Sequence, residues 1–450
     1  MARRAPLVSL VAVAAASACS DTTTTPGPGP GPSGPACKYV GTVEGADTAE
    51  RPLTTAECWF VGTLNPLSGP LGAVGLALEN AARLAVRDVN KAGGAAGKKL
   101  CLVACDDQTN SMLDEAIVAG LVRDYHIVAL NGAAASSSSL EAAKASKAAG
   151  IAQISCCSTS PALSLDPQIY RTVPSDALQG IVLASVARGL EEPAERVAIV
   201  HVNDTYGDSL KDVFLGAFEG LNGQVTRSVA YKPGEPSYTK ILEQALDPLP
   251  DHAVLIAFPA DGAQILRDWY LSGLAPKLRW LATDGLKDPR FVVAGGLVTD
   301  QVIGTAPQLE GTHFAGFKGR YSAAFGGEAP GIFTSNQYDA MILIALGIAR
   351  AGPAGRPMDV RARIPEVASA PGMPVSADRA EDLATALRLA GEGDVDYSGA
   401  SGELEMDARG DVITDYGVWR VNTSSLTDTR DCWTCTATSA LVHCREKSCG

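Results

Sequence analysis

The chain has 450 residues, far more than one small hydrophobic core requires, and its 46% hydrophobic and 19% charged residues are ordinary for a globular protein. Its formal net charge of −13 argues against a polyanionic partner, because phosphate backbones are bound by clustered Lys and Arg and no such cluster appears beyond Arg3-Arg4. We therefore expect a globular protein of two lobes with appendages, with no nucleic acid as partner.

Residues 1–19 have the pattern of a lipoprotein signal peptide. Two arginines precede an apolar stretch over residues 7–16, which is too short to cross a bilayer as a helix, and Ser17-Ala18 then precede Cys19. This arrangement resembles the cleavage box of bacterial lipoproteins, in which the Cys receives the lipid. We expect Cys19 to be the lipidation site and the exported protein to be membrane-anchored, in the periplasm or at the cell surface. The alternative is cleavage nearby by an ordinary signal peptidase.

Residues 20–57 form a tether and an N-terminal segment in this interpretation. The stretch from Asp21 to Pro35 (DTTTTPGPGPGPSGP) cannot bury a core, and its Pro-Gly repeat is typical of a semi-extended linker. Such a tether would join a lipidated Cys to a globular body. A generic disordered N-terminus is the alternative, and it predicts the same lack of regular structure.

Cys19 is one of eleven cysteines, and removing it leaves an even number. The others are Cys37, Cys58, Cys101, Cys105, Cys156, Cys157, Cys432, Cys435, Cys444 and Cys449. An even number in an exported chain favours disulfides, although sequence alone does not give the pairing. The C-terminal group could instead form a zinc site, but export favours disulfides, so we expect no metal. Residues 426–450 should then form a disulfide-stapled cap of their own.

From Cys58 onward, short apolar runs alternate with amphipathic helical stretches. Strands are expected over residues 58–64, 99–105, 126–130 and 151–155, then over 196–202, 224–231, 253–258 and 278–282. Helices are expected over 76–90, 112–123 and from about 139, then over 209–221, 238–246 and 263–272. This alternation predicts parallel sheets, because parallel strands require crossover connections. Two such sets predict an α/β fold of two doubly wound lobes, with ligands bound outside the carboxyl ends of the strands.

Two clusters of hydroxyl residues follow strands of the first set. In the first, Ala135 to Ser139, the pair Ser138 and Glu141 predicts a capping box that opens a helix. Free backbone N–H groups at a helix start suit a carboxylate, although capping alone would also explain the serines. The second cluster, Ser155 to Ser160, ends the next strand and could face the same point.

In the second set, Asp284 ends a strand and is followed by Gly285, a placement suited to binding an ammonium group by charge-assisted hydrogen bonds. A solvated loop acid is the alternative interpretation. Tyr206 and Phe258 also lie at strand ends, where they would either line a ligand or pack between the lobes.

A series of short motifs runs in order from about Cys58 to Val421. The motifs are VGTLNPLSGP at 61–70, Asp88-Val89-Asn90 with Gly93-Gly94 and Asp106-Asp107, Gly132 with Ser136–Ser139, Thr159 with Pro161, Tyr206-Gly207, Tyr338-Asp339-Ala340, and Asp407 with Gly410-Asp411. Each motif alone is weak, whereas the ordered set is specific. The set resembles the type I periplasmic binding proteins, and more narrowly the leucine/isoleucine/valine-binding branch that serves ABC importers.

The resemblance implies a ligand site shared between the lobes. In that family the first lobe holds the carboxylate of the ligand, and the second supplies two aromatic residues and an acid for the ammonium. The corresponding positions here are Ser136, Cys157 and Thr159 in the first lobe, and Tyr206, Phe258 and Asp284 in the second.

Three positions depart from the family pattern. Phe258 lacks the hydroxyl that branched-chain binders often carry, Cys157 replaces a small residue, and Val74 stands where an aromatic can cover the ligand. The carboxylate and ammonium sites are thus retained, whereas the side-chain pocket differs from a standard leucine pocket.

The resemblance also implies lobes that are discontinuous in sequence. Lobe 1 is expected over 58–173 plus 306–400 and lobe 2 over 174–305 plus 401–425. Their three-strand hinge is expected at Arg171–Pro174, Gly304–Pro307 and Gly399–Leu404. Closure about such a hinge would bury the ligand.

One motif points to an enzyme. Gly207-Asp208-Ser209-Leu210 matches the GDSL signature of a hydrolase family, whose Ser nucleophile requires a His base, commonly in a late Asp-x-x-His. None of the five histidines has an Asp three residues before it, and Asp208 and Ser209 suit the first turn of a helix. Phosphate-binding glycine loops are also absent.

We therefore expect neither an enzyme nor a cofactor. The expected protein is a solute-binding lipoprotein, a monomer, that captures a small amino-acid-like ligand in an interlobe cleft for an ABC permease in the membrane. The alternative is a ligand-sensing module of the same fold coupled to a signalling partner. Sequence alone leaves the ligand open among branched or polar amino acids, amides and other small carboxylates.

Overall fold

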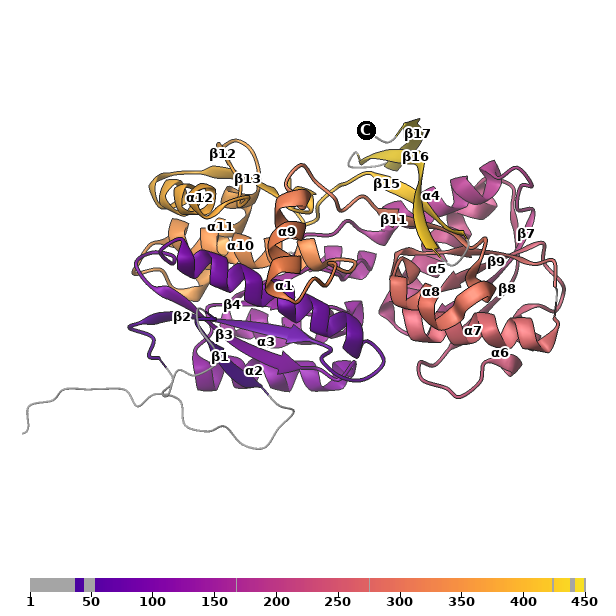
Figure 1. Ribbon diagram of the computed structural model, residues 1–450, viewed down its shortest axis with the longest axis horizontal. Helices are drawn as coiled ribbons and strands as arrows, with labels where there is room; N and C mark the ends of the chain where they lie inside the picture. Colours follow the sequence, from indigo (N-terminus) through magenta and orange to yellow (C-terminus); the bar gives the residue numbers. More distant parts are fainter. Residues whose placement is uncertain are drawn as a thin grey trace, which may run out of the picture.

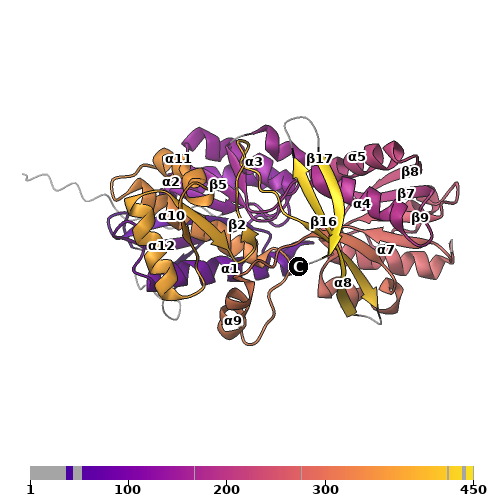
Figure 2. The same ribbon diagram turned by 90° about the horizontal axis from the view of Figure 1, so that it is seen from above.

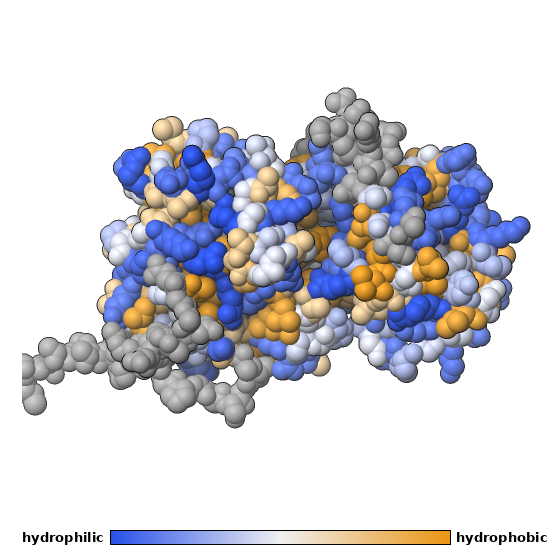
Figure 3. Space-filling model, viewed as in Figure 1, coloured by the Kyte–Doolittle hydropathy of each residue, from blue (hydrophilic) through white to orange (hydrophobic). Residues whose placement is uncertain are grey.

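A computed structural model describes residues 37–43, 53–166, 168–274, 276–422, 425–437 and 442–448, with only the backbone described over 428–437 and 442–448. Two α/β lobes lie side by side, each built on its own sheet with helices on both faces (Figure 1). The molecule narrows where the lobes meet (Figure 3). This arrangement confirms the predicted fold class.

The sheet of lobe 1 has six strands in the order β1-β3-β2-β4-β5-β6. They are β1 (Lys38–Gly41), β2 (Cys58–Asn65), β3 (Lys99–Asp106), β4 (Ala129–Gly132), β5 (Ala152–Ser155) and β6 (Ile169–Arg171). All neighbours are parallel except β1, which runs antiparallel to β3. β1 lies within residues 20–57, which we expect to comprise a tether and an N-terminal segment, and the Cys37–Cys105 disulfide attaches it to the end of β3.

Helices cover both faces of this sheet (Figure 1). They are α1 (Gly72–Lys91), α2 (Asp114–Tyr125), α3 (Ser136–Ala149), α9 (Phe314–Ala324), α10 (Thr334–Ala351), α11 (Pro357–Ala368) and α12 (Ala380–Glu392), with short 3-10 turns at Ser111–Leu113 and Pro161–Leu165. Along β2, Trp59 and Val61 pack with α1 and α10, while Phe60 and Leu64 pack with α2. Burial on both faces explains why the strand reads as one continuous apolar run.

Lobe 1 also contains a small three-stranded sheet in the order β12-β13-β14. Its strands are β12 (Met373–Val375), β13 (Val395–Gly399) and β14 (Gly402–Glu403).

The sheet of lobe 2 has eight strands in the order β17-β16-β15-β11-β10-β9-β7-β8. They are β7 (Arg196–Val202), β8 (Gln224–Tyr231), β9 (His252–Ile256), β10 (Arg279–Ala282), β11 (Ile303–Pro307), β15 (Tyr416–Asn422), β16 (Ser425–Ala437) and β17 (Val442–Ser448). The helices of this lobe are α4 (Asp176–Gly189), α5 (Thr205–Gly220), α6 (Thr239–Ala245), α7 (Pro259–Ser272) and α8 (Pro289–Gly295), with 3-10 turns at Asp284–Leu286 and Gly296–Thr299.

The C-terminal segment differs from the expected separate cap. β16 pairs with β15 and β17 pairs with β16, all antiparallel, so the backbone of residues 425–437 and 442–448 continues the sheet of lobe 2 (Figure 2). An unpaired β15 would leave a row of open N–H and C=O groups at the sheet edge, and pairing with β16 satisfies them. The side chains of Cys432, Cys435 and Cys444, and the whole of Cys449, lie outside the described residues.

The chain passes between the two sheets at three places. It leaves lobe 1 after β6, returns after β11, and crosses to lobe 2 again between β14 and β15. Near the hinge, Arg171 donates its backbone N–H to the carbonyl of Gly410, and Pro174 forms a bridge with Val412. Among the helices of the described residues, none combines the length and apolar composition that a bilayer crossing requires.

Candidate functional site

A pocket lies between the lobes, at the carboxyl ends of strands from both sheets. All six residues singled out from the sequence line it: Ser136, Cys157, Thr159, Tyr206, Phe258 and Asp284. The pocket encloses about 580 Å³ of space, counting its open mouth. Its lining is mainly apolar with a few polar groups, as is usual for small-molecule sites.

The first polar group is the start of α3. This helix begins at Ser136, after Ala135, so the predicted capping box of Ser138 and Glu141 is wrong. The capping position falls on a residue without a side-chain acceptor, which leaves the first-turn N–H groups free of a side-chain cap. With the positive end of the helix dipole, those N–H groups and the buried Ser136 hydroxyl suit a carboxylate.

The hydroxyl groups of Ser136 and Ser139 form hydrogen bonds that hold the loops beside the pocket in place. Ser139 Oγ accepts the backbone N–H of Ala133 at 3.1 Å, and it lies 2.8 Å from Ser158 Oγ. Ser136 Oγ in turn accepts the backbone N–H of Ser160 at 3.2 Å. The two hydroxyl clusters predicted to face one point therefore meet and hydrogen-bond to each other.

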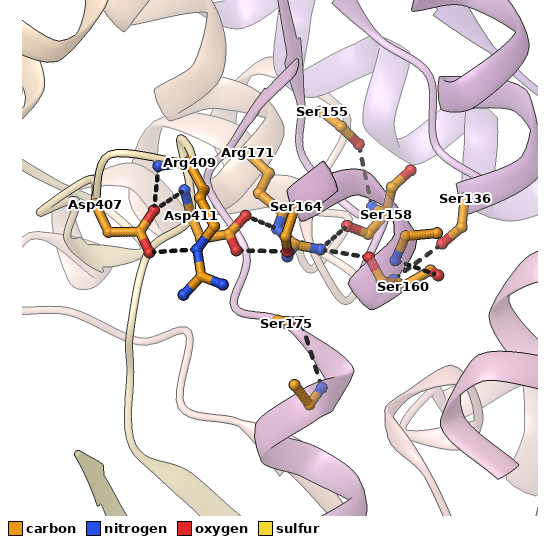
Figure 4. Close-up of polar contacts among 12 residues, drawn as sticks. Ser136, Ser155, Ser158, Ser160, Ser164, Arg171, Ser175, Asp407, Arg409 and Asp411 are labelled. Carbon is orange, nitrogen blue, oxygen red and sulfur yellow. Dashed lines mark hydrogen bonds and ion pairs between the residues drawn. The ribbon is translucent and has the colours of Figure 1, made fainter. Parts of the chain in front are cut away.

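Arg171 ties the second cluster to the hinge (Figure 4). Its fully buried guanidinium donates to the carbonyl oxygens of Ser158 and Ser160 at 3.2 and 3.0 Å. It also forms an ion pair with Asp411, at 2.7 Å between Nε and Oδ1. Sequence reasoning placed the hinge at Arg171 but missed this role, because Ser158 and Asp411 lie 13 and 240 residues away from it in the chain.

The lobe 2 wall carries two stacked aromatic rings and a carboxylate. The rings of Tyr206 and Phe258 are 5.7 Å apart between centroids, with planes inclined by 21°. Tyr206 Oη donates to Asp284 Oδ1 at 2.9 Å and lies 2.8 Å from Thr283 Oγ1. Gly285 leaves room for this arrangement, since a Cβ there would lie 2.6 Å from the carbonyl oxygen of Ala257.

Asp284 is buried, and burial raises the pKa of its carboxyl group above the ordinary value, while hydrogen bonds from Tyr206 and Gln179 lower it. A second buried acid, Asp176 at the start of α4 in lobe 2, accepts a 2.8 Å hydrogen bond from Thr159 Oγ1 of the lobe 1 wall. Burial, and then the charge of Asp284, raise the pKa of Asp176 well above its ordinary value. A cation entering the pocket would therefore relieve the repulsion between two buried acids.

The apolar part of the lining comes mainly from residues that the sequence did not single out. They are Leu71, Val74, Leu78, Ile332 and Phe333, with Pro66 and Ala134 beside them. Only Val74 was expected near the ligand. The loop before α10 was missed because it reaches the pocket from more than 160 residues beyond the serine clusters, and no local pattern marks it.

Three disulfides occur among the described cysteines: Cys37–Cys105, Cys58–Cys101 and Cys156–Cys157. The first two attach β1 and β2 to β3. The third joins neighbouring residues, and Cys157 lines the pocket. Cys19 lies outside the described residues. Within the described part of the chain, no group of three or more His, Cys, Asp or Glu side chains is arranged to hold a metal ion.

The GDSL residues lie in the first turns of α5, as expected. The Asp204 side chain caps this helix by accepting the backbone N–H of Gly207. Ser209 Oγ donates to the Thr205 carbonyl at 2.7 Å. Ser209 Oγ also bonds to Ser160 Oγ at 2.9 Å, which is a contact between the two lobes. His201 contacts Asp208 and not the serine.

The fold and this cleft define a two-lobed solute-binding protein. Residues 59–391 match the family model of the periplasmic binding proteins, so the chain belongs to that family. This is a family of binding proteins rather than enzymes, and the hydrolase interpretation is thereby set aside.

Two relatives show the level of similarity. An amino acid binding protein of Pseudomonas aeruginosa is 28% identical over 55% of this chain and 63% of its own length. The Leu/Ile/Val-binding protein BraC3 of Rhizobium johnstonii is 27% identical over 69% of this chain and 83% of its own length. The chain thus spans slightly less than two thirds of the first relative and more of the second.

Solved structures share the fold at low sequence identity. The leucine-binding protein LivK of Thermotoga maritima has a TM-score of 0.70 at 21% identity, covering 82% of this chain and 97% of its own. LivJ of Streptococcus pneumoniae, in complex with isoleucine, has a TM-score of 0.68 at 17% identity, covering 87% and 100%. A solute-binding protein of R. palustris in complex with benzoate has a TM-score of 0.68 at 15% identity, covering 82% and 95%.

Proposed function

We propose that the protein binds an α-amino acid with an apolar side chain in the interlobe pocket and delivers it to an ABC importer. The observation that carries this proposal is the buried Asp284 carboxylate in a pocket whose lining is otherwise mostly apolar. A buried carboxylate is costly unless it is paired, and the ammonium of an amino acid would pair it.

The opposite wall suits the other end of such a ligand. The start of α3 offers backbone N–H groups and the Ser136 hydroxyl to a carboxylate. Thr159 Oγ1 already donates its proton to Asp176, so toward a ligand it has only lone pairs left and would accept from the ammonium. Cys157 lines the same side.

The side chain of the ligand would lie against Leu71, Val74, Leu78 and Phe333. Apolar contacts of this kind favour an aliphatic or aromatic side chain over a polar one, because a polar group would lose its water without gaining a partner. Val74 and Phe258 distinguish this lining from that of a standard leucine pocket, and the preferred amino acid need not be leucine.

The alternative class of ligand is an aromatic acid, which has no ammonium group. The R. palustris relative in fold was solved with benzoate. In this chain benzoate would leave Asp284 buried and unpaired, which favours an amino acid.

The importer and the lipid anchor complete the proposal. The relatives that match this chain carry the names of amino acid and Leu/Ile/Val-binding proteins, and LivJ, which shares the fold, is named as the substrate-binding protein of a branched-chain amino acid transporter; this supports delivery of the ligand to a permease rather than sensing. A lipid on Cys19, with the Pro/Gly-rich stretch from Asp21 to Pro35 as tether, would hold the binding protein beside the membrane and outside the cytoplasm.

The experiment is a thermal-shift screen followed by calorimetry. Purified protein is screened against the twenty amino acids, benzoate and 4-hydroxybenzoate. We expect apolar amino acids to raise the melting temperature, since a ligand at 100 times its dissociation constant stabilises by about 2.7 kcal/mol. Stabilisation by benzoate alone, or by none of these compounds, would overturn the proposed function.

A further inference from the structure

The disulfide between the neighbouring residues Cys156 and Cys157 lies at the ligand pocket. Cys156 is fully buried, whereas Cys157 is half-buried and lines the pocket. The other two disulfides of the described residues lie in the sheet of lobe 1, outside the pocket lining. One disulfide therefore stands apart from those that fasten strands together.

The surroundings of this disulfide are apolar. Cys156 packs in one cluster with Leu78, Ala134 and Phe333, all of which also line the pocket. Cys157 and Val74 pack against the same cluster. Cys157 thus belongs to the apolar half of the lining, on which the side chain of a bound amino acid would rest, and Cys156 packs behind it.

The polar groups of the same loop are engaged on its other side. Ser155 Oγ accepts the backbone N–H groups of Cys157 and Ser158 at 3.3 and 3.1 Å, and it donates to the Ala133 carbonyl at 2.6 Å. Fixed from behind by these bonds, the loop presents the disulfide to the pocket as a rigid surface. Rigid binding surfaces lose little conformational entropy when a ligand arrives.

We propose that the Cys156–Cys157 disulfide is the element that selects the ligand by its side chain. This inference rests on the proposed function. Bonded sulfurs form a compact, polarisable, apolar contact, which suits aliphatic, thioether and aromatic side chains of amino acids. Two separate thiols need more room than a bonded pair, so opening the bond would push one sulfur toward Leu78 or into the space for the ligand. The ligands most affected would be those with side chains long enough to reach this wall.

The first test measures affinities of variants by calorimetry. We compare the wild-type protein, Cys156→Ala/Cys157→Ala and, as a matched control, Cys58→Ala/Cys101→Ala, which removes a disulfide remote from the pocket. The probes are leucine and 2-aminobutyrate, whose side chain is two carbon atoms smaller. We expect the pocket variant to bind leucine at least tenfold more weakly and 2-aminobutyrate at most threefold more weakly, and the control to change neither by more than twofold.

Each outcome has a definite meaning. An unchanged ratio of the two affinities in a folded pocket variant would overturn the inference while leaving the proposed function intact. If the wild-type protein binds neither probe and no other apolar amino acid, the proposed function fails, and this inference fails with it.

A second test uses the wild-type protein and does not depend on the variants folding. The phosphine TCEP reduces a disulfide to two thiols: the disulfide gains two electrons and two protons, and the phosphine becomes its oxide with oxygen from water. Alkylation and mass spectrometry then identify which disulfide has opened. We expect saturating leucine to slow the opening of Cys156–Cys157 at least tenfold and that of Cys37–Cys105 less than twofold. Equal protection of both, or free thiols at 156 and 157 before reduction, would contradict the inference.

Discussion

The lobe 1 wall of the pocket is built from neutral hydrogen-bonding groups, whereas the lobe 2 wall carries a buried carboxylate. On lobe 1, Ser136 and the first turn of α3 offer dipoles, and the loop that presents them is fixed to the hinge by Arg171. On lobe 2, Asp284 accepts a hydrogen bond from Tyr206, whose hydroxyl group also bonds to Thr283 of the same lobe. Neutral dipoles bind an anion without bringing a counter-charge into the cleft, while a buried acid requires a cation to be stable.

The largest effect on stability is expected from replacing Arg171, which fixes the loop of the lobe 1 wall to the hinge. Arg171→Met keeps the bulk of the side chain and leaves Asp411 buried without its ion pair, which should lower the free energy of unfolding by about 3–5 kcal/mol. Urea denaturation measures this change. The control is Arg409→Met, which removes an exposed partner of Asp407 in the same loop and should cost little (Figure 4). Equal losses in the two variants would show that the wall of lobe 1 does not depend on the hinge.

The next effect tests the charge on lobe 2. Asp284→Ala removes the partner of the ligand's ammonium and should weaken binding by about 2–5 kcal/mol, measured by calorimetry. Asp208→Ala removes an exposed acid of α5 that does not line the pocket, and it should leave the affinity unchanged. If Asp284→Ala bound the ligand as tightly as the wild-type protein, the charge on lobe 2 would not contribute to binding, and the contrast between the two walls would be wrong.

The pH dependence of binding sharpens the same contrast. Since burial raises the pKa of Asp284, acid protonates this group above the pH range of an ordinary Asp. A protonated Asp284 no longer attracts an ammonium, so affinity should fall as the pH is lowered and recover as the pH rises through the folded-state pKa. In Asp284→Asn this dependence should be reduced. A wild-type affinity that is constant from pH 7 down to pH 4 would argue that Asp284 does not contact the ligand.

A buried acid on lobe 1 provides a comparison away from the ligand. Burial, with the charge of Asp107, raises the pKa of Asp114 to about 8, and the nearby Ser138 hydroxyl offsets only part of this. Neither carboxylate oxygen of Asp114 has a hydrogen-bond partner within the described residues. A raised folded-state pKa stabilises the protonated form, so its contribution is complete below the unfolded pKa and is lost as the pH rises through about 8.

Asp114→Asn should therefore stabilise the protein above pH 8 by about 1–3 kcal/mol, because the amide removes the unpaired charge. The gain should shrink toward pH 4, and urea denaturation across this range measures it. The control is Asp124→Asn on the same helix, whose exposed carboxylate pairs with Arg123 and has a lowered pKa. A gain that does not grow with pH would mean that burial does not raise the pKa of Asp114 above its value in the unfolded chain. Ligand affinity should stay the same, since Asp114 does not line the pocket.

The resemblance to the periplasmic binding proteins implied the six residues that meet at the pocket, and each of them lies just after a strand, where doubly wound sheets place their ligands. The start of α3 was misplaced, because Ser138 with Glu141 fits a capping box while the chain turns into the helix three residues earlier. The apolar lining from Phe333, the ion pair of Arg171 and the pairing of β16 with β15 depend on contacts between distant parts of the chain. Local patterns carry no signal for such contacts.

The smallest effect concerns the neutral wall itself. Ser136→Ala removes one hydroxyl from the carboxylate site but keeps the backbone N–H groups at the start of α3, so binding should weaken by only about 0.5–1.5 kcal/mol. The neighbouring Ser137→Ala, which does not line the pocket, is the control and should bind normally. If Ser136→Ala weakened binding as much as Asp284→Ala does, the hydroxyl and not the helix start would hold the carboxylate. The proposed contrast, in which lobe 2 binds the ammonium by charge and lobe 1 binds the carboxylate by backbone dipoles, would then be wrong.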